Sequence, residues 1–391
     1  MTTLPPLVEP GAELTREEIN RYSRHLLIPN LGVIGQRRLK NAKVLVIGAG
    51  GLGSPTLLYL AAAGIGTLGV IDFDRVDESN LQRQVIHTVD SIGELKVESA
   101  RQAIARLNPL VKVIAHNDRL EPEMAVELFS RYDLILDGTD NFATRYLVND
   151  ACILANKPYV WGSIFRFEGQ ASVFWEDAPD GRGLNYRDLY PAPPPPELAP
   201  SCAEGGVLGV LCAAIASIMS TEAIKLLTGI GEPLLGRLMV YDALEMSYRE
   251  LRIRPLRDRQ AVTALSDYQA FCGLGQAKPD HDHSVPLISS LQLKSLKDAG
   301  KAPVIIDVRE QTEWDIVHID GALLMPKTAE LAAQIVERFG RDTDLVVTCK
   351  SGVRSQAVSS DLRKLGLDKV HNLDGGVLAW VREVDPALPS Y

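Results

Sequence analysis

The sequence lacks the cysteine spacing that a zinc site or a disulfide framework needs. Its 391 residues contain 5 cysteines, and no two of them form a Cys-x-x-Cys pair. They stand at irregular positions: Cys152, Cys202, Cys212, Cys272 and Cys349. An odd number at such spacing fits neither paired disulfides nor a four-thiolate zinc site. We therefore expect any cysteine with a special role to act as a free thiol.

The chain also lacks an excess of positive charge. Lys and Arg number 41 against 50 Asp and Glu, which leaves a formal net charge of −9. Proteins that bind nucleic acid rely on a positive field to displace the counterions of the phosphates. We therefore expect no nucleic-acid partner.

Long apolar runs and an export signal are missing as well. One apolar stretch without charge, residues 205–221, contains glycines and serines and falls short of the roughly 20 apolar residues of a membrane span. We expect a buried helix there and no membrane partner. Residues 1–18 contain acidic residues and prolines where a signal peptide has a basic and then an apolar segment, so we expect a cytoplasmic chain.

What the sequence does contain is an alternation of strand-like and helix-like segments. A length of 391 residues with 46% hydrophobic residues predicts two or three globular domains. An amphipathic helix is expected at residues 15–27. The segments after it follow the order strand 43–47, helix 56–63, strand 68–73, helix 96–107 and strand 112–115. This βαβαβ order is typical of a doubly wound parallel sheet.

Further strands are expected beyond that unit, at residues 133–137, 159–163, 169–175 and 237–247. The last two alternate between apolar and polar residues over longer runs, as antiparallel strands do. The predicted fold class is therefore α/β, with a Rossmann-like doubly wound mixed sheet.

A second, smaller α/β domain is expected after a linker. Residues 177–200 include four consecutive prolines and predict a surface loop. Residues 257–286 lack clear periodicity; they include His281 and His283, which could bind a metal but fit a solvated linker better. Strands at 303–308, 345–348 and 370–373 then alternate with helices at 328–339 and 355–365. The predicted domains are residues 1–256 and 287–391, joined by a linker at 257–286.

A glycine-rich loop directly follows the first predicted strand and opens a helix. It reads Gly48-Ala-Gly50-Gly51-Leu-Gly53, and amides in such a loop can approach phosphates at the positive end of the helix. Asp72 follows about 20 residues later, where a carboxylate can accept hydrogen bonds from ribose hydroxyls. A purely structural turn is the alternative. The loop and the carboxylate together favour an adenine nucleotide.

Charged side chains farther along the sequence distinguish an ATP site from an NAD site. Arg83 and Lys96 can neutralise the oxygens of a triphosphate, and Asp140, after the strand at 133–137, is placed to hold Mg²⁺. Each of these side chains, taken alone, could equally be a surface charge or a helix cap. Together they favour ATP chemistry, and a dehydrogenase is the less expected reading.

These motifs resemble the adenylating domain shared by ubiquitin-activating enzymes and the bacterial adenylyltransferases for molybdopterin synthase and thiamine biosynthesis. The resemblance covers roughly residues 14–255. It implies an ATP site formed by Gly48, Gly50, Gly51, Gly53, Asp72, Ser79, Asn80, Leu81, Gln82, Arg83, Lys96, Asp140 and Asn141. Catalytic roles are implied for Arg83, for Asp140 as the Mg²⁺ ligand, and for Arg24, which would reach the phosphates of the other subunit in a homodimer.

The reaction that the resemblance implies is the attack of a carrier protein's C-terminal glycine carboxylate on the α-phosphate of ATP. The products are an acyl-adenylate and pyrophosphate. The expected partner is therefore a ubiquitin-like sulfur carrier protein that ends in Gly-Gly.

The sequence departs from similar enzymes where those carry zinc. Such relatives bind it with two Cys-x-x-Cys pairs, but the first pair falls on Asn185 and Asp188 here. The second pair is absent from residues 257–273, which contain only Cys272. Because zinc needs thiolates or imidazoles at tetrahedral spacing, we expect no zinc.

Two cysteines are candidates for catalysis. Cys202 follows the proline run and precedes a predicted helix, a segment that resembles the one bearing the reactive cysteine of these enzymes; the alternative is a small buried side chain. Cys349 follows the strand at 345–348 and opens the loop Lys350, Ser351, Gly352, Val353 and Arg354, whose amides and cations would favour a thiolate. Cys152 and Cys212 lie in apolar helical patterns and are expected in the core.

The Cys349 loop, together with Asp307-Val-Arg309 and Asp374-Gly-Gly376, resembles a rhodanese sulfurtransferase over residues 287–391. The resemblance implies a persulfide on Cys349. Phosphatases of similar fold have five residues between the cysteine and the arginine, whereas four separate Cys349 from Arg354.

Joined in one chain, the two domains predict activation of a carrier by ATP followed by transfer of persulfide sulfur, giving a C-terminal thiocarboxylate. That product would serve molybdopterin, thiamine, cysteine or related biosynthesis, and the sulfur donor would be thiosulfate or a cysteine desulfurase. The main alternative is a conjugating activator that forms a thioester at Cys202 beside a regulatory rhodanese domain. A nucleotide-sensing binding module is the non-enzyme alternative.

Overall fold

The computed structural model describes residues 4–194, 206–272 and 285–391. Contacts divide the chain into two units, residues 1–276 (unit 1) and 277–391 (unit 2). Each unit has its own sheet and its own hydrophobic core. The fold class predicted from the sequence is confirmed.

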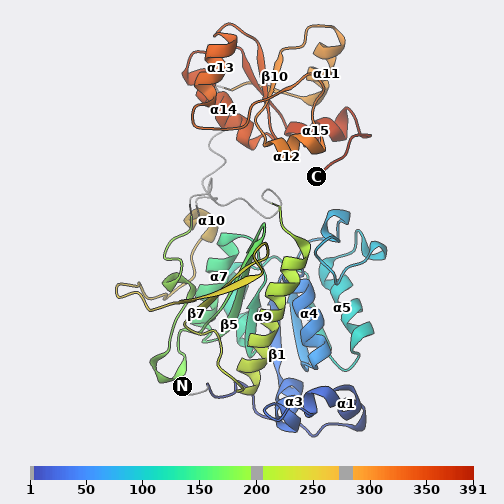
Figure 1. Ribbon diagram of the computed structural model, residues 1–391, viewed down its shortest axis with the longest axis vertical. Helices are drawn as coiled ribbons and strands as arrows, with labels where there is room; N and C mark the ends of the chain where they lie inside the picture. The colour runs from blue at the N-terminus through green and yellow to red at the C-terminus, as the bar shows by residue number, and fades with distance from the viewer. Residues whose placement is uncertain (1–3, 195–205, 273–284) are drawn as a thin grey trace. The chain divides into compact units, whose positions relative to one another are not determined.

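Unit 1 is built on an eight-stranded sheet in the order β3-β2-β1-β4-β5-β6-β7-β8 (Figure 1). Neighbours from β3 to β5 in that order pair in parallel, and β5 to β8 pair antiparallel. The sheet is therefore mixed, as expected. Its strands are β1 Lys43–Ile47, β2 Thr67–Ile71, β3 Lys112–His116, β4 Leu134–Asp137, β5 Tyr159–Phe165, β6 Glu168–Phe174, β7 Arg237–Asp242 and β8 Ser247–Arg252.

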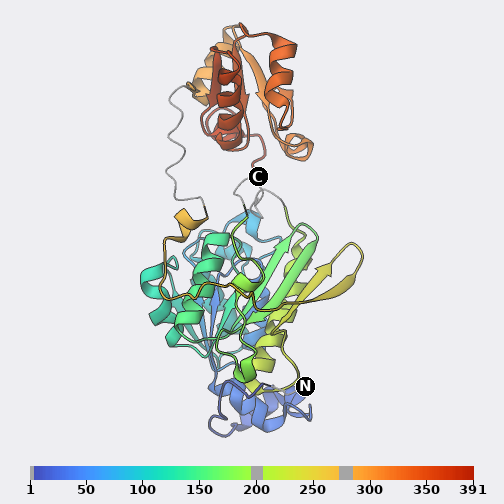
Figure 2. The same ribbon diagram turned by 90° about the vertical axis from the view of Figure 1, so that its left-hand side faces the viewer.

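Helices cover both faces of this sheet, which explains why its central strands are apolar on both sides. In β1, every residue after Lys43 is buried, and β4 is buried throughout. Helices α4, α5 and α9 pack together on one face, and α6 and α7 pack together on the other (Figures 1 and 2). The bounds are α4 Gly53–Ala63, α5 Lys96–Leu107, α6 Pro122–Ser130, α7 Phe142–Leu154 and α9 Gly209–Thr228.

Helix α9 contains most of the uncharged stretch. By length and composition it could cross a membrane, because its mean hydropathy reaches 1.7. It packs against α4, β5 and β6, with 56% of its apolar window buried. This is the position of a core helix, and the expected buried helix is confirmed.

Two expectations about local structure were wrong. The run at 237–247 is not one strand: β7 ends at Asp242, whose carboxylate accepts hydrogen bonds from the amides of Leu244 and Glu245, and β8 then returns beside β7. An aspartate that bonds the amides after it stabilises a turn. The helix at 15–27 is divided at Tyr22 into α1 Arg16–Arg21 and α2 Ser23–Leu26, followed by α3 Gly32–Asn41.

Short elements complete unit 1. The 3-10 helices are Glu78–Asn80, Val89–Ser91, Pro179–Gly181 and Tyr186–Asp188. Helix α10, Tyr268–Phe271, packs against α7 although it belongs to the stretch given to the linker from the sequence.

Unit 2 contains a five-stranded parallel sheet in the order β11-β10-β12-β13-β9. Helices α13 and α14 share one core cluster with it, and α11 and α15 share the other, so this sheet is also covered on both faces. Its elements are β9 Leu287–Ile288, α11 Ser290–Asp298, β10 Val304–Asp307, α12 Gln311–Ile316, β11 Leu323–Leu324, α13 Leu331–Phe339, β12 Leu345–Thr348, α14 Val353–Lys364, β13 Val370–Leu373 and α15 Gly376–Glu383.

Candidate functional site

The glycine loop between β1 and α4 can be built only from glycine at two positions. Gly48 has a φ of +88°, a conformation that other residues rarely adopt. A Cβ on Gly53 would lie 1.9 Å from the carbonyl oxygen of Gly48. The loop therefore turns sharply into α4 and leaves its amides beside an open pocket.

That pocket has a volume of about 980 Å³. It lies at the carboxyl ends of β1, β2 and β4, where the sheet order reverses and ligands of open α/β sheets bind. Most residues predicted for the nucleotide site line it, namely Gly48, Gly50, Gly51, Asp72, Asn80, Arg83, Lys96, Asp140 and Asn141. Four others do not: Gly53 starts α4, and Ser79, Leu81 and Gln82 lie in the segment that carries Asn80 and Arg83 without lining the pocket.

Asp72 is held in place at the pocket wall. Its carboxylate accepts hydrogen bonds from the amides of Ala49 and Asp74, each at 2.8 Å. Burial raises the pKa of Asp72, and the positive charge of Lys96 opposes that rise. Lys96 is itself buried and its Nζ lies 2.8 Å from Asp74 Oδ2. A buried cation therefore stands beside two carboxylates at the expected phosphate end.

A buried histidine that sequence reasoning did not single out fixes the glycine loop from the other side. His87 Nε2 lies 3.0 Å from the carbonyl oxygen of Ala49, and its Nδ1 lies 2.9 Å from Ser99 Oγ. Because a carbonyl only accepts, Nε2 carries a proton. Burial lowers the pKa of His87, which favours the neutral imidazole. The peptide of Ala49 is thus held by Asp72 at its amide and by His87 at its oxygen.

This burial predicts an acid-dependent loss of stability. The unfolded chain binds a proton at His87 near its usual pKa of 6.5, whereas the folded chain resists it. The free energy of unfolding is therefore unaffected by protonation of His87 above pH 6.5. It falls as the pH drops from there toward the lower pKa of the folded state, by at most about 1.4 kcal/mol per pH unit. We expect His87→Gln to reduce this slope in denaturant unfolding of unit 1 measured at several pH values. An unchanged slope would contradict the assignment.

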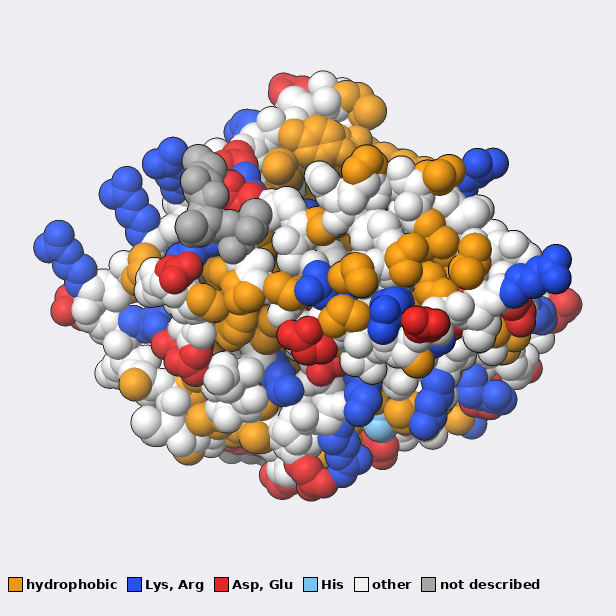
Figure 3. Space-filling view, turned by 90° about the horizontal axis from the view of Figure 1, so that it is seen from below, with side chains coloured by type: hydrophobic (Ala, Val, Ile, Leu, Met, Phe, Trp, Pro, Cys, Tyr) orange, Lys and Arg blue, Asp and Glu red, His pale blue; other side chains and the backbone are white. Residues whose placement is uncertain are grey.

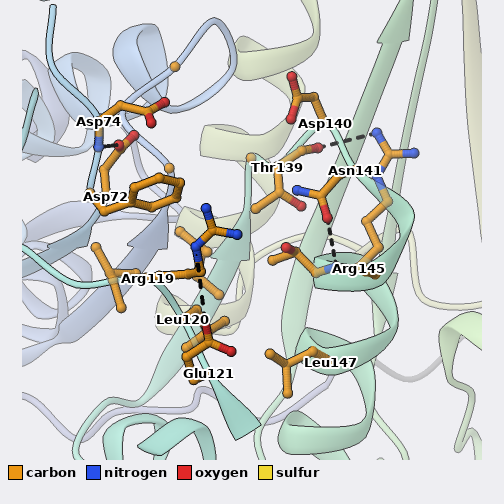
Figure 4. Close-up of a pocket in the computed structure, with 18 of the residues that line it drawn as sticks. Asp72, Asp74, Arg119, Leu120, Glu121, Thr139, Asp140, Asn141, Arg145 and Leu147 are labelled. Atoms are coloured by element: carbon orange, nitrogen blue, oxygen red, sulfur yellow. Dashed lines mark hydrogen bonds and ion pairs between the residues drawn. The ribbon is translucent and has the colours of Figure 1, made fainter. Parts of the chain in front are cut away.

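The opposite wall of the pocket follows β4. Figure 4 shows Asp72 and Asp74 on one side of the space and Thr139, Asp140 and Asn141 on the other. Asn141 Oδ1 accepts the amide of Thr144 at 2.9 Å and so caps α7. Asp140 is exposed and free to face a ligand in the pocket.

Two arginines of this pocket were missed from the sequence. Arg145, on the first turn of α7, is buried and donates from Nη2 to the carbonyl of Thr139 at 3.2 Å (Figure 4). Arg119, after β3, also lines the pocket, and its guanidinium carbon Cζ lies 4.3 Å from the ring centroid of Phe73. Neither belongs to a local motif, because tertiary packing alone brings α7 and the loop after β3 to the glycine loop.

The segment before the second unit forms another part of the pocket wall, which sequence reasoning also missed. Residues 265–269 line the pocket, and α10 begins within them. Nothing in their sequence marks a nucleotide site.

Arg24 is not brought to this pocket. Arg24 lies on α2, at the end of unit 1 opposite to α10 in both ribbon views (Figures 1 and 2), and does not line the pocket. Cys202 lies outside the described residues. Cys152 and Cys212 are buried, as expected for core cysteines.

The metal prediction concerns Asp140. Within the described ranges, no group of three or more His, Cys, Asp or Glu is placed to hold a metal ion. Mg²⁺ keeps waters and takes one or two carboxylates together with substrate phosphates. The residues therefore fit Mg²⁺ only as a companion of a bound triphosphate, with Asp140 as the protein ligand.

Unit 2 contains a second candidate site, a cradle around the Cys349 sulfur. Cys349 follows β12, and its Sγ accepts from the amides of Gly352 at 3.2 Å and Ser355 at 3.4 Å. Ser355 Oγ lies 3.3 Å from Sγ and 2.6 Å from Asn372 Oδ1. Since a hydroxyl has one proton, the shorter contact to Asn372 takes it. Sγ therefore faces two backbone donors at the start of α14.

The Asp374-Gly-Gly motif shapes this cradle. A Cβ on Gly376 would lie 2.4 Å from the carbonyl oxygen of Cys349. The amides of Val377 and Leu378, at the start of α15, donate to the carbonyls of Cys349 at 2.8 Å and Lys350 at 3.1 Å. The loop's carbonyls thus point toward α15, which leaves its amides for the sulfur.

Arg354 of the loop is paired with Glu313, a residue that sequence reasoning missed. Its two Nη atoms contact the carboxylate of Glu313 at 2.7 and 2.6 Å. Burial alone would raise the pKa of Glu313, but the hydrogen bonds from Arg354 lower it. Tyr391 donates to Glu313 at 2.9 Å, and burial raises the pKa of Tyr391 to about 12. Lys350 Nζ lies 4.5 Å from the centroid of the Tyr391 ring.

The ion pair Asp307–Arg309 supports this network from inside unit 2. Both side chains are fully buried, and Arg309 Nη2 lies 2.6 Å from Asp307 Oδ2. Arg309 also donates to the carbonyl of Val317 at 2.7 Å and to the hydroxyl of Tyr391 at 2.6 Å. The Asp-Val-Arg motif is therefore a structural anchor for the cradle.

Removing one partner of this pair is expected to destabilise unit 2 strongly. Arg309→Met leaves the carboxylate of Asp307 buried without its cation, which costs about 3–5 kcal/mol. Arg382→Met, which breaks an ion pair at the surface with Glu383, is the matched control and should cost about 0–1 kcal/mol. Denaturant unfolding of unit 2 measures both. Equal losses of unfolding free energy in the two variants would show that the buried ion pair stabilises unit 2 no more than the surface pair does.

Comparison with known proteins gives matches to both units. The model of the ThiF family matches residues 22–262, and that of the rhodanese-like domain matches residues 289–383. The probable adenylyltransferase/sulfurtransferase MoeZ of Mycobacterium tuberculosis is 60% identical over 390 residues, which cover 100% of each chain. The adenylyltransferase and sulfurtransferase MOCS3 of Drosophila willistoni is 39% identical over 97% of this chain and 86% of that one.

Solved structures match the fold over part of the chain. A crystal structure of E. coli MccB with ATP has a TM-score of 0.54 at 22% identity and covers 63% of this chain and 74% of that one. At this identity the likeness concerns the fold alone. The two family matches confirm both resemblances that the sequence motifs indicated.

Proposed function

The chain belongs to the ThiF family and carries a C-terminal rhodanese-like domain, and on this premise we propose the reaction that its two sites perform. Its relatives identify it as an adenylyltransferase and sulfurtransferase. The substrate that we propose is a ubiquitin-like sulfur carrier protein ending in Gly-Gly. The product is that carrier with a C-terminal thiocarboxylate, a sulfur source for molybdopterin, thiamine, cysteine or related biosynthesis.

The first step takes place in the pocket of unit 1. An oxygen of the carrier's glycine carboxylate attacks the α-phosphorus of ATP, and the bond to the β-phosphate breaks to release pyrophosphate. A carboxylate is already a nucleophile, so the site needs positioning and charge stabilisation more than acid–base chemistry. Lys96 and Arg83 are among the cations that line the pocket, and Asp72 is oriented to receive ribose hydroxyls.

Mg²⁺, when bound with ATP, neutralises phosphate charge, and Asp140 would hold it. The exposed carboxylate of Asp140 in the pocket wall supports this role.

A homodimer would complete the site with Arg24 of the second copy. Arg24 does not line the pocket of its own chain, which supports a role across an interface. The segment around it exposes apolar side chains, namely Ile19, Leu27, Ile28, Val33 and Ile34. Orange patches are also present on the face that Figure 3 shows. Analytical ultracentrifugation tests the state, and a monomer at micromolar concentration would remove Arg24 from the mechanism.

The second step uses the cradle of unit 2. The Cys349 thiolate attacks the outer sulfur of the donor and becomes a persulfide, while the sulfur–sulfur bond of the donor breaks. Thiosulfate leaves as sulfite, and the persulfide of a cysteine desulfurase leaves as that enzyme's cysteine thiolate. The outer sulfur attacks the acyl carbon of the adenylate, and the bond to AMP breaks, which leaves an acyl disulfide on Cys349. Because Sγ of Cys349 has no exposed surface, a persulfide brings the reacting sulfur one bond farther out.

Release of the product requires a second thiol. The thiolate of Cys202 attacks Sγ of Cys349 and expels the carrier thiocarboxylate, and the resulting Cys202–Cys349 disulfide is opened by a cellular dithiol. A Cys202→Ala protein that still forms thiocarboxylate at the full rate would exclude Cys202 from this step. The need for free thiols supports a cytoplasmic location, which cell fractionation tests.

The observation that carries the proposal is the joint presence of a lysine- and arginine-lined nucleotide pocket and a sulfur cradle in one chain. The test is intact-mass analysis of candidate carriers after incubation with the protein, Mg-ATP and thiosulfate. Replacement of one oxygen by one sulfur is the expected result. Adenylate without sulfur would favour the conjugating activator with a thioester at Cys202 instead.

A further inference from the structure

A ring of charged and polar side chains occupies the place where similar enzymes carry zinc. Asp188 is buried; its Oδ1 accepts the amide of Leu256 at 2.9 Å, and its Oδ2 accepts the amide of Asn185 at 2.9 Å. Oδ2 also accepts a hydrogen bond from Arg259 Nη1. Every side-chain oxygen of Asp188 is therefore in use.

Arg259 closes the ring through its other amino group. Its Nη2 lies 2.5 Å from Glu176 Oε1, and Glu176 Oε2 accepts from Asn185 Nδ2 at 2.9 Å. We call Glu176, Asn185, Asp188 and Arg259 the charged clamp. It joins the segment after β8 to the segment after β6, 71 positions apart between Asp188 and Arg259.

The chemistry of this ring does not fit zinc. Structural zinc takes four thiolate or imidazole ligands in a tetrahedron. The clamp offers two carboxylates and one amide, and the guanidinium of Arg259 already supplies the positive charge between them. A metal cation at that point would be repelled by Arg259.

A second anchor lies farther along the same segment. The hydroxyl of Tyr268 donates to Asp150 Oδ2 at 2.8 Å, and Arg187 Nη2 lies 2.7 Å from the same oxygen. Asp150 is on α7, so this contact fixes α10 to the body of unit 1. Arg187 sits in the same short 3-10 helix as Asp188, which links the second anchor to the clamp.

Residues that line the nucleotide pocket lie between these two anchors in the chain. Leu265, Ser266 and Asp267 lie between Arg259 and Tyr268 in the chain, and all three line the nucleotide pocket. A segment held at both ends loses most of its conformational freedom before a ligand arrives.

We propose that the charged clamp replaces the zinc site and that its task is to hold residues 265–269 as a wall of the ATP pocket. Arg259 is thus a positioning residue for the nucleotide, acting through this segment. The inference rests on the proposed function, because it takes the pocket as the ATP site.

The test compares Arg259→Ala with Arg257→Ala in the full-length protein. Arg257 is exposed and lies two positions earlier, so the control removes the same charge from the same segment. Isothermal titration calorimetry with a non-hydrolysable ATP analogue is expected to show about tenfold weaker binding for Arg259→Ala and wild-type binding for Arg257→Ala. Hydrogen exchange in residues 259–272 should rise in Arg259→Ala alone.

A second variant and a metal analysis also test the charged clamp. Tyr268→Phe, which keeps the ring and removes only the hydroxyl, should weaken analogue binding in the same direction if Arg259→Ala fails to fold. Metal analysis of the wild-type protein should find zinc well below one atom per chain.

The outcomes separate the inference from the proposed function. Stoichiometric zinc, or analogue binding and exchange unchanged in Arg259→Ala and in Tyr268→Phe, would overturn the clamp. A wild-type protein that binds no ATP analogue would instead overturn the proposed function, and faster exchange in Arg259→Ala would still identify the clamp.

Discussion

Cys349→Ala is expected to abolish sulfur incorporation into the carrier while carrier-dependent ATP–pyrophosphate exchange continues at the wild-type rate. The nucleotide pocket is formed within unit 1 and the sulfur cradle within unit 2. Removing the sulfur atom therefore deletes the persulfide without touching any group that lines the ATP pocket. Intact-mass analysis of the carrier measures the first activity, and exchange of labelled pyrophosphate measures the second.

Cys349→Ser is the control for packing. Its hydroxyl can accept the amides of Gly352 and Ser355, so the cradle keeps its hydrogen bonds, but an alcohol forms no persulfide. Both variants should lose sulfur transfer equally. Thiocarboxylate formed by either one would show that the sulfur passes through another thiol.

Lys96→Ala is expected to reduce pyrophosphate exchange by about 10²–10³-fold, the range seen when one preorganised electrostatic donor is removed from an active site. Lys96 is buried, and its ammonium lies beside Asp74 and opposes the rise that burial causes in the pKa of Asp72. Without it, the two carboxylates would face the triphosphate with no lysine between them. The incoming carboxylate of the carrier would add further uncompensated negative charge.

Lys112→Ala provides the matched comparison. Lys112 starts β3 and is exposed outside the pocket, so its loss changes the net charge by the same amount. Exchange should stay near the wild-type rate in that variant, and sulfur transfer from thiosulfate to cyanide by unit 2 should be normal in both. A comparable loss in Lys112→Ala would mean that net charge, and not the position of Lys96, controls the step.

The sequence predicted those parts of the fold and of the site that are encoded locally. The glycine loop needs only Gly48 and Gly53 in their positions between β1 and α4, and the cradle needs Cys349 and Gly352 between β12 and α14. Strand, loop and helix follow one another directly in both cases. A motif read along the chain therefore places the reactive groups correctly relative to the backbone.

Residues that act from another element were not predicted. His87 holds Ala49 across 38 positions, and Glu313 holds Arg354 across 41. Residues 265–269 line the pocket, and Arg259 and Tyr268 bind their segment to side chains far earlier in the chain. No local periodicity or spacing encodes such contacts, since they depend on how helices and loops assemble around the finished sheet.

The separate sheets and cores of the two units also bear on the kinetics of the overall reaction. The covalent connection between the two units acts as a tether that sets an effective concentration of one reacting site for the other. The activated carrier would then meet its sulfur by intramolecular capture, ahead of hydrolysis of the adenylate by water. The fusion of the two units thus raises the yield of thiocarboxylate by protecting the labile acyl-adenylate. The intrinsic rate of either chemical step is unaffected.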